Sequence, residues 1–320
     1  MNKILIIGAG QLGSRHLQGA LQSALPLNIT VVDPSIDSLN IAQLRAEQVS
    51  IENVKRTVQY SQSLPKAESF DVCIIATSAP VRAKVTANLL AENKVRYIIF
   101  EKVLFQALRE YTEVAALLEQ HNVTAWVNCP RRLYPSYQQI KELLNPNEVL
   151  AMKVSGSGWG MACNSIHFID LFSYLCNEAN LQATENNLDT QLLESKRVGF
   201  YELTGKAKFM LGQHSLELEC TTADEVAIQV SLSSDSNTIS IDEITGTIIT
   251  ANVSAEQQFK HQVKYQSELT GLNIDEILNT NTSSLTPFNE SCQLHTPMIE
   301  LYLEHINNVL NKNLLTCPIT

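Results

Sequence analysis

The beginning of the chain constrains its fold most, because an apolar run leads directly into a glycine-rich turn. Residues 4–7 are four consecutive branched apolar residues, a pattern typical of a strand buried on both faces. The spacing G-x-G-x-x-G follows at once. Its first glycine permits a tight turn, its second leaves room for a pyrophosphate, and its third lets a helix pack closely. The run therefore predicts a dinucleotide-binding turn with the cofactor residues Gly8, Gly10, Gln11, Leu12 and Gly13.

A second predicted strand, residues 29–33, ends in an acid at the place where such turns bind ribose. Asp33 lies twenty residues beyond Gly13, and its carboxylate can accept hydrogen bonds from both ribose hydroxyls of an adenosine. Residues 34–38 contain no Lys or Arg to neutralise a 2′-phosphate, so like charge favours NAD over NADP. A glycine-rich turn that binds no nucleotide is the alternative interpretation.

Strand and helix patterns alternate over the first 128 residues, which predicts a doubly wound parallel sheet with right-handed crossovers. Strands are expected at 54–60, 70–77, 96–102 and 123–128, and helices at 38–47, 80–93 and 107–121. Such sheets bind ligands beyond the carboxyl ends of their strands. The polar residues expected there are Asp33, Thr77, Ser78, Glu101, Lys102 and Asn128. Residues 1–126 are therefore assigned to a Rossmann domain.

The rest of the chain, residues 127–320, has the pattern of an α+β domain. Helices are predicted at 135–144, 164–176 and about 289–311, and a strand at 149–155. Between 198 and 266 apolar and polar residues alternate with period two, which indicates an open, mainly antiparallel sheet with one wet face. Few predicted helices remain to cover its Leu, Ile and Val residues. We therefore expect a homodimer or homotetramer that forms through this sheet.

Composition excludes several classes of protein. The chain has 320 residues, enough for two domains, with 44% hydrophobic and 18% charged residues as in ordinary globular proteins. A formal net charge of −10 argues against nucleic-acid binding, and no run of about 18 apolar residues predicts a membrane span. The chain enters a strand at once, without a signal peptide, and its seven scattered cysteines indicate reduced thiols, a cytoplasmic location and no metal site.

Two residues are candidates for the chemistry. Lys102 follows a strand end, where its ammonium group could donate to a substrate oxygen beside a nicotinamide ring. His167 lies on the predicted helix 164–176, and an ordinary histidine pKa of about 6.5 suits proton exchange with an alcohol. A solvated lysine and a packed, hydrogen-bonded histidine are the alternatives. We expect the two side chains, which come from different domains, to act at one cleft.

Further residues are candidates for substrate binding. Arg132 could clamp an anionic group of a substrate, or it could order the linker between the domains. Asn128, Trp159 and Asn164 are the other candidates, and Asn164 could also orient His167. The sequence lacks the G-x-S-x-G, G-x-x-x-x-G-K and H-E-x-x-H patterns, so it contains none of these signatures of hydrolases, phosphoryl-transfer enzymes and metalloproteases.

Taken together, these segments resemble the Gfo/Idh/MocA family, named for glucose–fructose oxidoreductase and inositol dehydrogenase. The resemblance rests on Gly8-Ala-Gly-Gln-Leu-Gly-Ser-Arg-His16, Ala76-Thr77-Ser78, Glu101-Lys102, Arg132-Leu-Tyr-Pro135 and His167-Phe-Ile-Asp170. It implies a catalytic lysine at 102, an acid/base histidine at 167, and a nicotinamide cofactor. It differs at Val103, where the family usually has proline, and at Cys163, where the family commonly has the aspartate that partners the histidine.

The sequence thus predicts an NAD(P)-dependent oxidoreductase that acts on a hydroxyl or carbonyl of a sugar, sugar derivative or cyclitol. The variant residues 164–170 resemble family members of surface-sugar pathways. Because Cys163 removes a carboxylate, a cofactor-binding sensor or structural protein without turnover is the first alternative. A reductase of a non-sugar carbonyl or imine, which would share Lys102 without needing His167, is the second.

Overall fold

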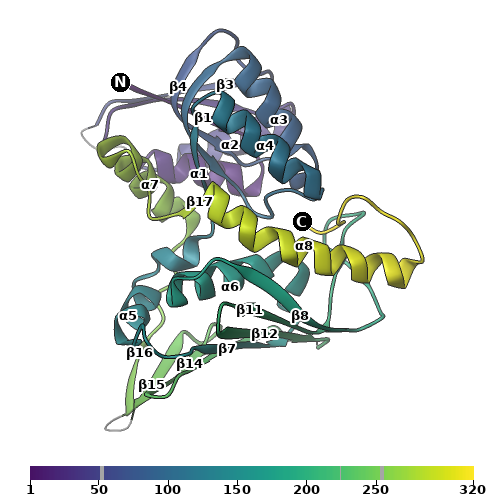
Figure 1. Ribbon diagram of the computed structural model, residues 1–320. Coiled ribbons are helices and arrows are strands. Elements are labelled where there is room, and N and C mark those ends of the chain that lie inside the picture. The colour runs from purple at the N-terminus through teal and green to yellow at the C-terminus, as the bar shows by residue number, and fades with distance from the viewer. Residues whose placement is uncertain (51–53, 224, 253–255) are drawn as a thin grey trace. The chain divides into compact units, whose positions relative to one another are not determined.

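The computed structural model describes residues 1–50, 54–223, 225–252 and 256–320 (Figure 1). These residues divide into two compact units that are discontinuous in sequence. The first unit comprises 1–105, 109–130 and 264–289, and the second comprises 106–108, 131–263 and 290–320. The boundary expected at 126/127 cuts the chain once, whereas here residues 264–289 return to the first unit.

The first unit contains the predicted Rossmann sheet. Its strands are β1 (Asn2–Ile7), β2 (Leu27–Val32), β3 (Arg56–Ser61), β4 (Ser69–Ile75), β5 (Lys94–Phe100), β6 (Thr124–Val127) and β17 (Thr286–Pro287). They lie in the order β17-β6-β5-β4-β1-β2-β3, all parallel except the short edge strand β17. Residues Ile4, Leu5 and Ile6 are completely buried. Burial on both faces explains the unbroken apolar run and confirms the predicted doubly wound sheet.

Helices cover both faces of this sheet: α1 (Gln11–Ala20), α2 (Ile36–Ala46), α3 (Ala79–Glu92) and α4 (Leu108–Gln120). The chain moves outward from β1 through β2 to β3 in one direction, and from β4 through β5 to β6 in the other. Right-handed crossovers then place α1 and α2 on one face and α3 and α4 on the other. The order reverses between β1 and β4, which is where sheets of this kind open a ligand crevice.

An additional helix of the first unit, α7 (Gln266–Thr280), was not predicted from the sequence. It packs against α1, and Figure 1 shows the two helices side by side. The contact is close because glycines face it on both helices. A Cβ added to Gly19 would lie 2.7 Å from the Cβ of Thr270, and one added to Gly271 would lie 2.5 Å from the carbonyl oxygen of Gly19.

The second unit contains the predicted mainly antiparallel sheet, in the order β16-β15-β14-β13-β7-β12-β11-β8. Its only parallel pair among the described residues is β7 with β12. The strands are β7 (Ala151–Ser157), β8 (Leu181–Leu188), β11 (Gly205–Leu211), β12 (His214–Thr221), β13 (Ala227–Ser233), β14 (Asn237–Asp242), β15 (Thr247–Asn252) and β16 (Glu256–Lys260). Strand β8 was not predicted. Part of the predicted alternation between 198 and 266 lies outside the described residues.

The remaining elements of this half are helical apart from a short hairpin. They are a 3₁₀ turn (Pro130–Leu133), α5 (Pro135–Leu143), α6 (Met161–Cys176), β9 (Leu193–Glu194), β10 (Tyr201–Glu202) and α8 (Phe288–Leu310). The predicted C-terminal helix, 289–311, thus agrees with α8 to within one residue. No helix in the described part of the chain is long and apolar enough to cross a membrane.

The two faces of this second sheet differ in chemistry. Alternate apolar residues, for example Leu216, Leu218 and Val230, are at most 1% exposed within the single chain. The opposite face bears charged pairs, in which Lys153 and Lys206 each lie within 4 Å of the carboxylates of Glu217 and Glu219. These buried residues need no partner to cover them, so an oligomer would have to form through the opposite, charged face, and it stays a prediction.

Candidate cofactor and catalytic site

The glycine-rich turn between β1 and α1 has the geometry that its sequence predicts. Gly8 has a φ of +96°, which side chains rarely allow, and a Cβ on Gly13 would lie 1.7 Å from the carbonyl oxygen of Gly8. Gly10 differs from both. A methyl group there would meet no other described residue within 4 Å, its chain neighbours aside. The first and third glycines are thus required by the fold, whereas the second leaves open space at the N-terminus of α1.

Asp33, directly after β2, connects the turn to the next helix. Its Oδ2 accepts a hydrogen bond from the Ala9 amide at 2.7 Å, and its Oδ1 accepts one from the Ser35 amide at 2.8 Å. Ser35 in turn caps α2 by accepting a bond from the Ser38 amide. Each carboxylate oxygen retains a second lone-pair direction, so this anchored acid can still accept bonds from ribose hydroxyls.

The first turn of α1 has a cationic support that the sequence analysis missed. Arg45 of α2 donates from Nη2 to Oε1 of Gln11 at 2.7 Å and from Nη1 to Oγ of Ser14 at 2.5 Å. These contacts fix Gln11, a predicted cofactor residue. The neighbouring Leu12 is 41% exposed. Nothing in the spacing of Arg45 marks it, because the contact joins two helices across a crossover.

Glu101 follows β5 and is buried, with 3% of its surface exposed. Its Oε1 accepts hydrogen bonds from Nε2 of His16 at 2.8 Å and from Nδ2 of Asn128 at 2.6 Å. Burial alone would raise the pKa of this carboxyl. The hydrogen bond and charge of His16, the bond from Asn128 and the positive charge of Arg82 outweigh it and lower the pKa below its ordinary value. Glu101 is therefore an ionised carboxylate at neutral pH.

The contacts of Glu101 continue into a closed ring of side chains, all of them buried except the half-buried Gln266. Nδ2 of Asn128 also donates to Oε1 of Gln266 at 2.7 Å, and Nε2 of Gln266 donates to Oγ1 of Thr270 at 2.9 Å. Oγ1 of Thr270 lies 2.9 Å from Nδ1 of His16, which closes the ring. His16 is not among the site residues predicted from the sequence. Its spacing from Gly13 and Ala20, at i+3 and i−4, already places it on the buried face of α1.

Lys102 follows Glu101 and leads into a buried segment, residues 103–105. Its side chain is partly exposed, and its amide donates to Oε2 of Glu101 at 3.2 Å. The peptide bond between Lys102 and Val103 is cis, at the position where the family usually has proline. The candidate lysine therefore stands beside an ionised carboxylate at the carboxyl edge of the parallel sheet.

In the second unit, α6 carries His167, which is partly exposed. The nearby Asp170 is completely buried and forms two hydrogen bonds with Arg132, from Nε at 3.0 Å and from Nη2 at 2.9 Å. Arg132 also reaches Glu290 at 3.1 Å. Since Arg132 is 7% exposed and bound by two carboxylates, its contacts favour the structural alternative over a substrate clamp.

The loop before α6 accounts for the other two substrate candidates. The indole of Trp159 is buried, donates to the carbonyl of Glu219 at 3.0 Å and packs edge-to-face on Phe168. Nδ2 of Asn164 donates to the carbonyl of Trp159 at 2.7 Å, so its described contact orders this loop. A carboxylate that sequence reasoning missed, Glu202, accepts from the amide of Ala162 in the first turn of α6.

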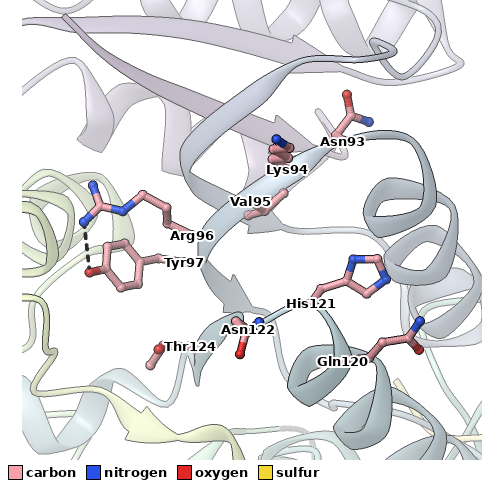
Figure 2. A pocket seen from close by; sticks show the side chains of 9 residues that line it. All are labelled: Asn93, Lys94, Val95, Arg96, Tyr97, Gln120, His121, Asn122 and Thr124. Carbon is pink, nitrogen blue, oxygen red and sulfur yellow. Dashed lines mark hydrogen bonds between the residues drawn. The ribbon is translucent and has the colours of Figure 1, made fainter.

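A cavity of about 590 Å³ lies at the opposite edge of the parallel sheet, at the start of β5 and β6. Figure 2 shows its polar lining, in which Arg96 points toward Tyr97 and away from His121. Arg96 is engaged by Asp71 and by the hydroxyl of Tyr97. Because nucleotides bind at the carboxyl ends of parallel strands, this cavity is separate from the candidate site.

The residues at the carboxyl edge fit a dinucleotide. Open space adjoins Gly10, and the amides of the first turn of α1 have no partner within the helix. Two buried polar atoms also have no hydrogen-bond partner among the described residues, Oγ1 of Thr77 after β4 and Oδ1 of Asn128 after β6. Ser78 begins α3 at the same edge. In the described part of the chain, His, Cys, Asp and Glu form no cluster that could hold a metal ion.

A model of the oxidoreductase family with an NAD-binding Rossmann fold, Gfo/Idh/MocA, matches residues 2–129. Over these residues the chain is similar to the NAD-binding domain of that family. The match covers β1 to β6 and includes the glycine turn, Asp33, Glu101 and Lys102. The match agrees with the predicted resemblance over the part of the chain that forms the Rossmann sheet. No curated protein sequence matches the chain significantly.

Solved structures of similar fold cover nearly the whole chain. One is the UDP-N-acetylglucosamine 3-dehydrogenase from Acidithiobacillus ferrooxidans, with 12% identity, a TM-score of 0.71, and coverage of 94% of this chain and 96% of that chain. An oxidoreductase from Agrobacterium radiobacter in complex with NAD⁺, L-tartaric acid and magnesium has 13% identity, a TM-score of 0.70 and coverage of 96% and 97%. A 3-ketoreductase from Actinomadura kijaniata in complex with NADP has 12% identity and a TM-score of 0.66, with coverage of 93% of this chain and 95% of that chain. At these identities they support the fold alone.

Proposed function

We propose that the protein transfers a hydride between a nicotinamide cofactor and a hydroxyl or carbonyl group of a sugar, sugar derivative or cyclitol. The observation that carries this proposal is the open space at Gly10 beside the anchored Asp33, in a turn of the Gfo/Idh/MocA family. The named activity of one similar structure, a UDP-N-acetylglucosamine 3-dehydrogenase, supports a sugar substrate, and that of another, a 3-ketoreductase, supports a carbonyl as the reacting group. A role in the synthesis of surface sugars is part of the proposal.

The bound nicotinamide would supply or accept the hydride. Lys102 lowers the cost of negative charge on the reacting oxygen, because its ammonium group can donate to that oxygen. His167 takes the proton from the same hydroxyl during oxidation and returns it during reduction. Glu101 keeps the backbone at Lys102 in place through its bond to the Lys102 amide. Arg132, Trp159 and Asn164 shape the region around α6 through their hydrogen bonds.

We further propose that NAD(H) is preferred to NADP(H). A 2′-phosphate would meet the carboxylate of Asp33 at close range, and the nearby cation Arg45 is already engaged by Gln11 and Ser14. Titration of intrinsic fluorescence with each reduced cofactor tests this. Tighter binding of NADPH than of NADH would contradict it.

The substrate proposal is tested by absorbance of reduced nicotinamide in the presence of the purified protein. We expect turnover with at least one member of a panel of free sugars, cyclitols and nucleotide-linked sugars, offered with NAD⁺ and, as ketones, with NADH. Binding of NADH without turnover of any hydroxyl or carbonyl compound would instead support the sensor or structural alternative. Turnover limited to non-sugar carbonyls or imines would support the reductase alternative.

A homodimer or homotetramer through the exposed face of the second sheet completes the proposal. This face carries paired lysines and glutamates, so such an interface would be polar and sensitive to salt. Light scattering at micromolar concentration tests it, and a monomer at low and high salt would contradict it.

All seven cysteines are free thiols, which supports the expected cytoplasmic setting.

A further inference from the structure

Arg82, on the second turn of α3, is a buried cation that binds the backbone of two loops. Its guanidinium donates to the carbonyl oxygens of Val103 and Leu104 through Nη1, the latter at 2.8 Å. Through Nη2 it donates to the carbonyl oxygen of Thr77. Thr77 follows β4, and Val103 and Leu104 follow β5. One side chain therefore joins the loops that continue two neighbouring parallel strands.

The guanidinium of Arg82 and two of the carbonyl groups that it binds lie in buried residues, so the loss of these hydrogen bonds would be costly. Arg82 is 2% exposed, and Val103 and Leu104 are at most 1% exposed. A buried carbonyl without a hydrogen-bond donor is costly, so the guanidinium satisfies groups that water cannot reach. Burial would raise the pKa of the neighbouring Glu101 carboxyl; His16 and Asn128 lower it, and the positive charge of Arg82 lowers it further. Arg82 thus binds the residues that follow Lys102 in the chain, Glu101 precedes it, and the opposite charges of Arg82 and Glu101 attract each other.

We propose that Arg82 is a positioning residue for Lys102. Its planar fork binds carbonyl groups on both loops at once, and so fixes the segment that carries Lys102 relative to the segment that carries Thr77 and Ser78. The inference rests on the proposed function, in which Lys102 donates to the reacting oxygen and the loop after β4 adjoins the cofactor. A lysine at position 82 would keep the charge but could not reproduce the fork.

The order of the two loops is measured by amide hydrogen exchange with mass spectrometry, which needs no substrate. In Arg82→Met we expect exchange to rise about tenfold or more in peptides covering 76–79 and 102–107, because the buried carbonyls lose their donors. Arg82→Lys should give a smaller rise in the same peptides. It also serves as the second variant if Arg82→Met does not fold.

Thr86→Val is the matched control, since Thr86 is also buried on α3 and its described hydrogen bond goes to the carbonyl of Arg82 within the same helix. It should leave exchange in both loops near the wild-type level. Equal exchange in Arg82→Met and wild type would overturn the proposal. So would the same rise in Thr86→Val, because the effect would then come from α3 in general.

Catalysis provides the second readout, once a substrate is found with the panel. We expect hydride transfer in Arg82→Met to fall about tenfold or more at saturating substrate, with NADH affinity within about threefold of wild type, and partial recovery in Arg82→Lys. Unchanged hydride transfer despite looser loops would overturn the positioning role. Failure of wild-type protein to bind NADH would instead refute the proposed function, which the exchange experiment does not depend on.

Discussion

Replacement of Gly10 by alanine should separate cofactor binding from folding. The backbone at Gly10 has a φ of −64°, which alanine adopts without strain, and the added methyl group would meet no other described residue within 4 Å. Loss of a glycine N-cap costs at most about 1 kcal/mol of stability. The same methyl group would occupy the space through which a pyrophosphate approaches the turn. We therefore expect NADH affinity to fall by about 10- to 100-fold, or about 1.4–2.8 kcal/mol.

The assay is thermal or urea unfolding with and without NADH. At a concentration of 100 times the wild-type Kd, NADH should stabilise the wild-type protein by about 2.7 kcal/mol. A 10- to 100-fold weaker Kd leaves about 1.4–0.4 kcal/mol at the same concentration. Gly13→Ala is the comparison, because its methyl group would lie 1.7 Å from the Gly8 carbonyl oxygen and should destabilise the unliganded protein by about 1–3 kcal/mol. Equal stabilisation of Gly10→Ala and wild type by NADH would refute the argument.

Three further predictions concern single residues. Lys102→Met and His167→Ala should each lower single-turnover hydride transfer by about 100-fold with NADH affinity little changed, and wild-type rates in both would contradict the catalytic assignment. Arg132→Met should destabilise the protein by about 3–5 kcal/mol in urea, because Asp170 stays buried without its cation; a raised KM at unchanged stability would instead indicate a substrate clamp. Glu101 has a lowered folded-state pKa, so it stabilises the fold above its unfolded-state pKa of about 4.3, and this stabilisation is lost as pH falls through the lower folded value. Urea midpoints of wild type and Glu101→Gln should therefore converge as pH falls from about 5 to about 3, and a constant difference would contradict this.

The features that the sequence predicted correctly are local. The buried run at residues 4–7, the glycine spacing and the acid at Asp33 lie within one β-α-β segment, where period and turn chemistry determine structure. The sheet of the second unit was predicted for the same reason, since its alternation is visible within each strand. The boundaries of the C-terminal helix follow from its apolar periodicity over many turns.

The features that could not be predicted from the sequence depend on contacts between distant segments. His16 bonds to Glu101 and Thr270, which are 85 and 254 residues away, and no short-range pattern connects them. Arg132 was a candidate substrate residue because the sequence does not show whether an arginine faces solvent or is buried and paired with a carboxylate. The expected oligomer interface assumed an uncovered apolar face, whereas alternate residues such as Leu216, Leu218 and Val230 are buried within the single chain; the oligomer itself stays a prediction.

The return of α7 to the first unit has a consequence for synthesis of the protein. Residues 131–263 must leave the ribosome before α7 is available, which takes about 7–27 s at typical elongation rates. During that interval the surface of α1 at Gly19 lacks its helix, and His16 lacks Thr270. A nascent chain that ends near residue 130 therefore cannot complete the nucleotide-binding half. The cofactor-binding half of this protein becomes complete late in translation, although most of its residues are made first.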